Sequence, residues 1–563
     1  MDIEKLLENV QRPARYIGSE WNVVKKDFDA CSVKVALCFP DAYEIGMSHL
    51  GFKILYHLLN EQKGVVCERV FTPWFDMQEV LKREGVKLFS LESKRPLTDF
   101  DIAGFSLGHE LNYTNVLSML SLAGIPLKSS GRSDNFPIIV GGGVCCVNPE
   151  PMADFFDAFL IGEAEEAVLE IVEKVKRKKE KGKSEILKDL AKIEGMYIPS
   201  FYDVEYNDDK TIKSFKPKDA SVPAKIKKRI VKDFENSYYP VKQIVPYIQV
   251  VHDRISLEIM RGCPNRCYFC QATSFYRPLR LRSAQSLLEL AEKTYKETGY
   301  DEISLVSLSS GDHPQILEIV ENMTKRFAGR KVSLSLPSLR AEDILGSLPR
   351  LISTIKKTGL TFAPEAGTQR MRDSINKRLD IEKLYACVIE AAKNGWRHVK
   401  LYFMIGLPGE KEEDIAGIAE LAAKISRPDQ ALGKPPISVT VSVSYYVPKP
   451  HTPFELEPMA DTATLKERQA LLQKAIKNKR AELKWHNAEM SFIEAVFSRG
   501  DRRLSEVVLK AHELGARFDS WREGFNLQLW KGAFNSAGVD PDFYLYRKRE
   551  KNEILPWSHI DCG

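Results

Sequence analysis

Short apolar strands alternate with amphipathic helices twice along this chain, and this alternation restricts the possible folds more than any other feature. In the first series the predicted strands are 33–39, 101–107, 136–143 and 157–162. Predicted helices separate them, as in 47–61, where leucine and isoleucine recur at helical spacing. Alternation of this kind is typical of a doubly wound parallel sheet, so we predict an α/β domain of that type over 1–200.

A second β/α series follows a lysine- and proline-rich stretch at 201–250, which we predict to be a linker. Its six predicted strands are 255–260, 302–310, 332–339, 360–367, 398–409 and 439–448. Six such units indicate a partial (β/α)6 TIM-like barrel over 251–460, with its active site at the C-terminal ends of the strands. The remaining residues, 461–563, carry helical patterns and are predicted to form a helical C-terminal region. At 563 residues the chain is longer than one hydrophobic core usually supports, which agrees with several domains.

Composition and the N-terminal segment predict a cytoplasmic protein with no membrane partner. No apolar stretch is long enough to cross a bilayer, and the charged segment 1–16 lacks the apolar core of a signal peptide. In a reducing compartment the ten cysteines are expected as thiols or metal ligands rather than disulfides. The net charge of +5 is small beside 82 basic and 77 acidic residues, so a nucleic-acid partner is neither predicted nor excluded.

Three of the cysteines, Cys263, Cys267 and Cys270, crowd into the segment RGCPNRCYFC directly after the first predicted barrel strand. Thiolates bind iron–sulfur clusters or zinc. Three ligands on one short loop leave the fourth iron of a cubane cluster open to a bidentate substrate. Spacing alone also permits a zinc site completed by a distant histidine or cysteine. The position at a strand end, where catalytic loops of such barrels lie, favours the catalytic cluster.

The CxxxCxxC spacing, with Phe269 before the last cysteine, resembles the signature of the radical S-adenosylmethionine (SAM) superfamily. The resemblance covers about 250–460 and implies a [4Fe–4S] cluster on the three cysteines, bound SAM, and reductive cleavage of SAM to a 5′-deoxyadenosyl radical. It implies SAM contacts, in strand order, at Phe269, Ser309, Ser310, Gly311, Asp312, Ser338, Arg340, Glu365 and Gly406. The stretch from Ser309 to Asp312 departs from the family's Gly-Gly-Glu pattern, so backbone contacts are expected there.

The N-terminal domain resembles that of the cobalamin-binding radical SAM proteins. In those proteins a D-x-H-x-x-G motif follows the first strand, and its histidine ligates cobalt. Here the motif reads Asp41-Ala-Tyr43-Glu-Ile-Gly46, with tyrosine in place of histidine. The resemblance therefore implies either a base-off cobalamin or a domain that kept the fold and lost the ligand. The implied cobalamin contacts are Asp41, Tyr43, Gly46, Ser106, Gly141, Gly142 and Gly143.

Three further residues are candidates for binding substrate. Arg277 and Arg280 follow the cysteine loop, where they would clamp an anion or pair with acids on the barrel rim. His451 ends the sixth predicted strand, where it would face substrate or serve a structural role. His49 and His109 are candidates for contacts with corrin or cobalt, or for roles on a helix face or as helix caps.

These features predict a radical SAM enzyme that catalyses cobalamin-dependent methylation of an unknown substrate, with a flavodoxin or ferredoxin as reductant. One alternative is a radical rearrangement, cyclisation or sulfur insertion without cobalamin. Sulfur insertion is disfavoured because Cys31, Cys38 and Cys67 are too dispersed for a second cluster triplet. The other alternative is a sensor that binds a cluster and cobalamin without turnover.

Overall fold

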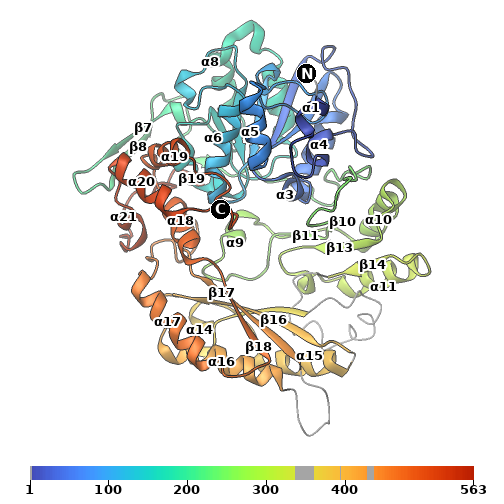
Figure 1. Cartoon of the computed structure of the whole chain (residues 1–563), viewed down its shortest axis with the longest axis vertical. Coiled ribbons are helices and arrows are strands. Elements are labelled where there is room, and N and C mark those ends of the chain that lie inside the picture. The colour runs from blue at the N-terminus through green and yellow to red at the C-terminus, as the bar shows by residue number, and fades with distance from the viewer. Residues whose placement is uncertain (1–2, 337–359, 394, 428–436) are drawn as a thin grey trace.

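The computed structural model describes residues 3–336, 360–393, 395–427 and 437–563. Figure 1 shows an N-terminal α/β domain above, two parallel sheets with helices below, and a C-terminal helical region that runs along one side and packs on the upper domain. None of the helices in these ranges is long and apolar enough to span a bilayer.

The N-terminal sheet has the order β2–β1–β3–β4–β5–β6, and all neighbouring strands are parallel except β5 and β6. Its strands are β1 Val33–Phe39, β2 Val65–Phe71, β3 Ile102–Ser106, β4 Ile138–Gly142, β5 Ala158–Leu160 and β6 Met196–Tyr197. The doubly wound prediction is confirmed. In sheets with this 2-1-3-4-5 order, ligands bind outside the carboxyl ends of the strands, where β1 and β3 diverge.

Strand β2 was not predicted, because Glu68 and Arg69 interrupt its apolar run. The structure buries both charges with partners that lie far away in sequence. Arg69 pairs with Glu20 at 2.7 Å and with Glu92 at 2.6 Å, and Glu68 accepts a hydrogen bond from Ser90. A buried charge is tolerated when it is paired and hydrogen-bonded, and those partners are not visible in the local sequence.

Helices cover both faces of this sheet. Helices α5 and α6 pack with one face, and α4, α7 and α8 pack with the other. The helices of this domain are α1 Ile3–Leu7, α2 Ala14–Ile17, α3 Tyr43–Gly46, α4 Leu50–Glu61, α5 Phe75–Arg83, α6 Tyr113–Leu122, α7 Ala167–Val175 and α8 Lys178–Leu190. Two 3₁₀ turns matter for the site, η2 Glu110–Asn112 and η4 Val144–Val147, because they follow the carboxyl ends of β3 and β4.

The second part of the chain contains all six predicted strands as parallel strands in two sheets. One sheet has the order β10–β13–β14, with β10 Ile255–Glu258, β13 Glu302–Val306 and β14 Ser333–Ser335. The other has the order β15–β16–β17–β18, with β15 Leu360–Glu365, β16 His398–Ile405, β17 Ser438–Tyr445 and β18 Ala481–Trp485. Their helices are α10 Ala284–Thr298, α11 Ile316–Phe327, α14 Gln369–Ser374, α15 Ile381–Lys393 and α16 Glu412–Ser426.

Strand β18 differs from the prediction, which continued a helix through this segment. Helix α17, Thr462–Ala475, ends earlier, and the chain then pairs in parallel with β17. Leu483 and Trp485 pack against the hydrophobic core, while Glu482 and Lys484 point outward. The open edge of the sheet supplies backbone partners and an apolar face, and these outweigh the helical preference of the charged residues.

The linker and the C-terminal region pair with each other, and the C-terminal region packs on the N-terminal domain. The linker forms a hairpin of β7 Tyr202–Tyr206 and β8 Ile212–Pro217, followed by β9 Ile226–Lys227, which pairs with the C-terminal β19 Ile560–Asp561. The C-terminal helices are α18 Ala488–Ser498, α19 Leu504–Glu513, α20 Leu527–Ala537 and α21 Asp542–Leu545. Helix α19 packs on α6 and α20 packs on α19. The fold-class prediction is therefore confirmed, with β18 and β19 added to the helical region.

The loop after β15 lies directly against the backbone of α16. A Cβ atom on Gly367 would stand 2.2 Å from the carbonyl oxygen of Asp414 and 2.4 Å from the amide nitrogen of Ile418. No side chain fits at these distances, so glycine is required where this strand end docks on its helix.

We therefore expect Gly367→Ala to destabilise the protein by about 2 kcal/mol, because backbone atoms rather than a flexible side chain must move. The measurement is chemical denaturation followed by circular dichroism. Gly532→Ala in α20 is the matched control, since its new Cβ would meet the flexible Leu514 side chain, at 3.2 Å, as its nearest neighbour. Equal stability of the two variants would contradict the expectation.

Candidate active site

The three predicted cluster cysteines lie on one loop that is closed by a small antiparallel ladder. Strands β11 Met260–Arg261 and β12 Arg280–Leu281 pair with each other, and the loop between them carries Cys263, Cys267, Cys270 and helix α9 Gln271–Phe275. All three thiols are free and partly exposed. Gly262 begins the loop with φ +93°, and its Cβ would stand 2.8 Å from the Tyr276 carbonyl oxygen, so only glycine fits there.

The electrostatics of Cys267 show that the three thiols and two charged side chains gather at one place. Burial raises the pKa of the Cys267 thiol to about 11, the Lys377 ammonium lowers it, and the charges of Cys270, Glu365 and Cys263 raise it. The Lys377 ammonium lies 3.3 Å from Glu365 Oε1. A thiol that resists ionisation is still a good metal ligand, because the metal replaces the proton.

Glu365 reaches this place through an irregularity in β15. The register of β15 against β16 shifts between Phe362 and Glu365, and Glu365 has φ +68°. Burial raises the pKa of its carboxyl group and Lys377 lowers it. Sequence reasoning missed Lys377, which stands in an unremarkable charged segment.

The predicted SAM contact after β13 is joined directly to the cysteine loop. Ser309 donates a hydrogen bond to Asp312 Oδ2 at 2.6 Å, and Asn265 donates to the same oxygen at 2.9 Å. Asn265 Nδ2 also lies 3.6 Å from Cys263 Sγ. Asn265 was not predicted as a site residue, although its place between Cys263 and Cys267 was a usable signal.

An apolar group of residues lies beside the cysteines at the ends of β15, β16 and β17. Phe269 packs there with Ala366 and Leu407. Gly406, with φ +86°, donates its amide hydrogen to Glu410 Oε2 at 2.8 Å, and burial raises the pKa of Glu410 to about 7. The predicted contacts Ser338 and Arg340 lie outside the described residues.

The three candidate substrate residues do not gather at this site. Arg280 makes two hydrogen bonds to Glu163, at 2.7 and 2.6 Å, so its guanidinium is already paired. His451 Nε2 donates to the Val147 carbonyl oxygen at 3.0 Å and docks its loop on the N-terminal domain. Arg277 is partly exposed next to Pro278. Arg280 therefore fits the alternative role of pairing with an acid at the barrel rim, and His451 fits a structural role, better than either fits substrate binding.

In the N-terminal domain, the residues after β1 are bound to protein groups. The Tyr43 hydroxyl donates to Glu20 Oε1 at 2.8 Å, and burial strongly raises the pKa of this phenol. Trp521 of the C-terminal region donates its indole N–H to Asp41 at 2.7 Å. Gly46 is a packing residue, since its Cβ would lie 2.3 Å from the ring of Phe71.

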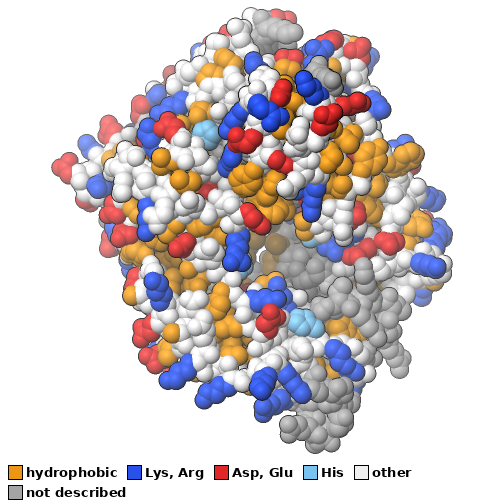
Figure 2. All heavy atoms as spheres, in the orientation of Figure 1, with side chains coloured by type: hydrophobic (Ala, Val, Ile, Leu, Met, Phe, Trp, Pro, Cys, Tyr) orange, Lys and Arg blue, Asp and Glu red, His pale blue; other side chains and the backbone are white. Residues whose placement is uncertain are grey.

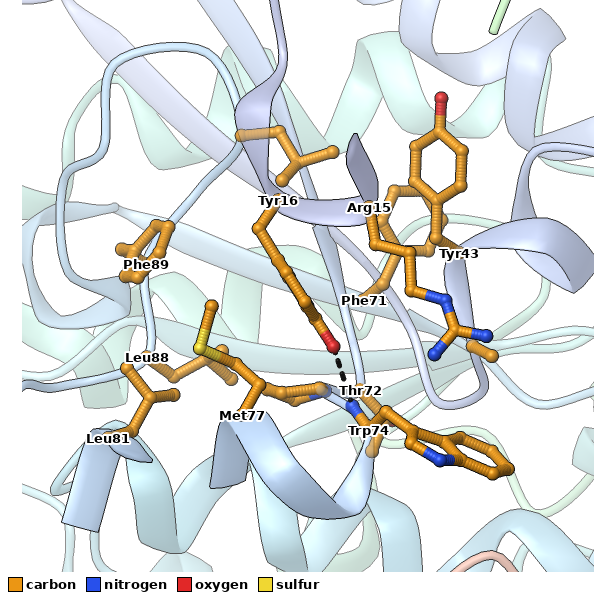
Figure 3. Close-up of a pocket in the computed structure, with 13 residues that line it drawn as sticks. Arg15, Tyr16, Tyr43, Phe71, Thr72, Trp74, Met77, Leu81, Leu88 and Phe89 are labelled. Atoms are coloured by element: carbon orange, nitrogen blue, oxygen red, sulfur yellow. Dashed lines mark hydrogen bonds between the residues drawn. The ribbon is translucent and has the colours of Figure 1, made fainter. Parts of the chain in front are cut away.

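A small cavity lies beside these residues, lined by Tyr16, Tyr43, Phe71, Thr72 and Trp74 among others (Figure 3). The Tyr16 hydroxyl accepts a hydrogen bond from the Trp74 amide within it. Its volume of about 20 Å³ holds one water molecule, so it is not a cofactor cavity.

The ends of β3 and β4 are more open than the end of β1. Ser106 pairs in register with Gly142. Among the described residues, no atom lies within 4 Å of the position that a Cβ on Gly142 or Gly108 would take. Gly141, by contrast, packs against Phe159, and Gly143 has φ +118°.

This open edge faces the cysteine loop. Turn η4, which follows β4, contacts α9, which follows the cysteines. Ser274 of α9 donates to the His451 carbonyl oxygen at 2.5 Å, and His451 contacts Val147 of η4. Figure 2 shows a recess near the centre of this face of the molecule, between the upper domain and the lower sheets. These contacts place the β3 and β4 edge next to the cysteine loop.

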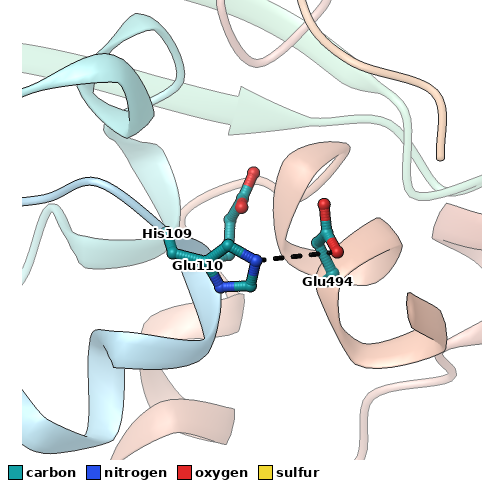
Figure 4. A group of neighbouring side chains, drawn as sticks. All are labelled: His109, Glu110 and Glu494. Atoms are coloured by element: carbon teal, nitrogen blue, oxygen red, sulfur yellow. Dashed lines mark ion pairs between the residues drawn. The ribbon is translucent and has the colours of Figure 1, made fainter. Parts of the chain in front are cut away.

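An ionic group at the same junction joins the three parts of the chain. Figure 4 shows His109 and Glu110 of the N-terminal domain beside Glu494 of α18. His109 Nε2 lies 3.7 Å from Glu494, and the Lys449 ammonium lies 2.7 Å from Glu110 and 2.8 Å from Glu494. The pKa of Glu110 falls to about 2, because Lys449 and His109 outweigh the effect of burial. Carboxylates and an imidazole in such a group could hold a metal, but here the ammonium takes that place.

Comparisons with known proteins agree with this geometry. A family model described as "Radical SAM superfamily" matches residues 257–422, and one described as "Radical SAM proteins, N-terminal" matches residues 51–199. The uncharacterized protein MJ0966 of Methanocaldococcus jannaschii is 27% identical over 509 residues, which cover 90% of this chain and 97% of that protein. Cytidylyl-2-hydroxyethylphosphonate methyltransferase of Streptomyces wedmorensis is 28% identical over 154 residues, which cover 26% of this chain and 28% of that protein.

Among solved structures, the radical SAM methyltransferase TsrM from Kitasatospora setae, with cobalamin and a [4Fe–4S] cluster bound, has a TM-score of 0.54 at 12% identity. The alignment covers 89% of this chain and 99% of that one. The same enzyme with tryptophan and a SAM analogue bound has a TM-score of 0.50. At this identity the likeness concerns the fold, and it extends over almost the whole of both chains.

We expect Lys377→Met to slow alkylation of Cys267 in the iron-free protein by about three-fold or more at pH 8, because loss of the positive charge raises the thiol pKa further and leaves less thiolate. The measurement is the rate of iodoacetamide labelling by mass spectrometry across pH 7–10. Lys393→Met, which removes an exposed lysine of α15, should leave the Cys267 profile unchanged. An unchanged profile in Lys377→Met would show that the ammonium does not act on this thiol.

Proposed function

We propose that this chain, which belongs to the radical SAM superfamily, is an enzyme that cleaves SAM reductively at a [4Fe–4S] cluster held by Cys263, Cys267 and Cys270. The observation that carries the proposal is three free, partly exposed thiols on one loop, gathered at the ends of parallel strands beside Lys377 and Glu365. This donor set fits a cluster with one open iron, since three thiolates leave the fourth iron of a cubane without a protein ligand.

When bound, the cluster and SAM together supply one-electron cleavage of a carbon–sulfur bond. The chain's own residues bind and orient SAM around that chemistry. Phe269, which packs on the buried Ala366 and Leu407, offers its partly exposed ring to the adenine. Asp312, held by Asn265 and Ser309, and Glu365, held by Lys377, offer carboxylates for the ribose and the amino group.

We further propose that the N-terminal domain binds cobalamin and that the enzyme methylates its substrate. Space at Gly108 and Gly142, opposite the cysteine loop, supports a ligand at this edge. The fold likeness to a cobalamin-containing methyltransferase and the partial likeness to a second methyltransferase point the same way. Burial and the Glu20 carboxylate raise the pKa of the Tyr43 phenol and keep it protonated, with its O–H donated to Glu20. A neutral phenol is a poor cobalt ligand, so a cobalamin here would be base-off without that ligand.

The enzyme needs a one-electron reductant and a substrate. We propose a flavodoxin or ferredoxin as the electron donor, and the cytoplasm as the compartment, because partly exposed cluster thiols need a reducing environment. The substrate, approaching through the recess between the two strand-end edges, would lie between SAM and the corrin.

Anaerobic reconstitution with iron and sulfide, followed by SAM and a reductant, should yield 5′-deoxyadenosine. Cys267→Ala and Cys270→Ala should each abolish this product and most of the bound iron, because a cubane needs all three ligands. Cys31→Ala is the matched control, since that thiol is also partly exposed but lies in the N-terminal domain. A fully loaded wild-type protein that forms no 5′-deoxyadenosine would contradict the proposed reaction.

Titration with cobalamin should produce corrin absorbance on the wild-type protein after gel filtration. Gly142→Val should weaken this binding by about ten-fold or more, because its side chain fills the open edge without meeting protein atoms. Tyr43→Phe should bind with an unchanged spectrum, because the hydroxyl is not a cobalt ligand. If wild type binds no corrin, or Gly142→Val binds as well as wild type, methylation through this edge is excluded.

A further inference from the structure

The ladder that closes the cysteine loop contains an unfavourable pair. Arg261 and Arg280 stand opposite each other in the register of β11 and β12. Like charges directly opposite on neighbouring strands destabilise the pairing. The Arg261 side chain is 8% exposed and that of Arg280 is 10% exposed, so water screens their repulsion poorly.

A carboxylate from another domain resolves this conflict. Glu163 follows β5 of the N-terminal sheet and is buried. It makes two hydrogen bonds to Arg280, at 2.7 and 2.6 Å, and its Oε2 lies 3.3 Å from Arg261. The same Oε2 accepts the amide hydrogen of Val231 at 2.6 Å. One side chain therefore contacts both arginines and the linker.

The remaining partners of the pair do not replace Glu163. Arg261 also pairs with Glu165 and with Glu258, each at 2.8 Å. The other hydrogen bonds of the Arg280 guanidinium go to backbone carbonyl oxygens, those of Val231, Pro278 and Tyr276. Without Glu163, the Arg280 guanidinium would stay largely buried, with these backbone carbonyl oxygens but no carboxylate as partners.

We propose that Glu163 is a positioning residue that closes the cysteine loop only when the N-terminal domain is docked on it. The loop's two ends are drawn together by a carboxylate that belongs to the other domain, so docking and loop closure are one event. The three cysteines are thereby held in a single arrangement facing the open edge of β3 and β4. The inference rests on the proposed function only in that this loop carries the cluster.

The test measures loop opening directly, by hydrogen exchange and mass spectrometry of the loop peptide in the anaerobic, cluster-loaded, full-length protein. Glu163→Gln should exchange about ten-fold or more faster than wild type over residues 260–281, because breaking a buried pair leaves an uncompensated charge. Glu166→Gln, the same substitution three residues away at an exposed partner of Arg229, should exchange like wild type. Equal protection in Glu163→Gln and wild type would overturn the proposal.

A double variant shows whether the loop opens because the two arginines repel each other or because packing is lost. Adding Arg280→Gln to Glu163→Gln removes the repulsion, so it should restore much of the protection that Glu163→Gln alone loses. If Glu163→Gln does not fold, the double variant and Arg280→Gln alone still decide the matter, since both lack the unopposed pair and should fold. A double variant as open as Glu163→Gln, or as unable to fold, would overturn the proposal.

A second readout is the low-temperature electron paramagnetic resonance spectrum of the reduced cluster with and without SAM. In Glu163→Gln the cluster signal should broaden and respond less to SAM, while Glu166→Gln should match wild type. If wild type itself shows no cluster signal and no 5′-deoxyadenosine, the proposed function fails. The exchange comparison, repeated on the cluster-free full-length proteins, then still tests the role of Glu163 in closing the loop.

Discussion

The docking of the cysteine loop on the carboxyl edge of the N-terminal sheet is the contact on which the rest of the candidate site depends. Parallel strands present their carboxyl ends at one edge, so two parallel sheets can face each other only if something holds those edges together. Helix α9 against η4, His451 on Val147 and Glu163 on the arginine ladder do this here. These contacts hold the carboxyl edge of the N-terminal sheet beside the cysteine loop.

The C-terminal region also contacts the N-terminal domain near the carboxyl ends of its strands. Asp519 accepts hydrogen bonds from Thr114 of α6 at 2.5 Å and from Trp530 at 2.9 Å. Trp521 donates to Asp41 at the end of β1. The crevice where doubly wound sheets usually bind ligands is thus partly covered by the chain itself, and the open space moves toward β3 and β4.

Buried charges are used throughout to join segments that are distant in sequence. Three ionic groups do this: Arg69 with Glu20 and Glu92, Lys449 with Glu110 and Glu494, and Glu163 with its arginines. A buried charge is costly alone and tolerable when paired, so each pair specifies which segments must meet. In the cysteine loop such pairs lie beside the proposed cluster ligands.

The sequence by itself determined what depends on near neighbours. The alternation of apolar runs predicted most strands of the parallel sheets, and the spacing of Cys263, Cys267 and Cys270 predicts a set of cluster ligands, because one loop carries all three. The sequence did not reveal β2, β18, Lys377 or Asn265. It also suggested substrate binding for Arg280 and His451. Only the tertiary structure decided these, since strand pairing, burial and counter-ions come from residues tens to hundreds of positions away. The free energy of a contact between residues distant in sequence cannot be read from the residues next to either one.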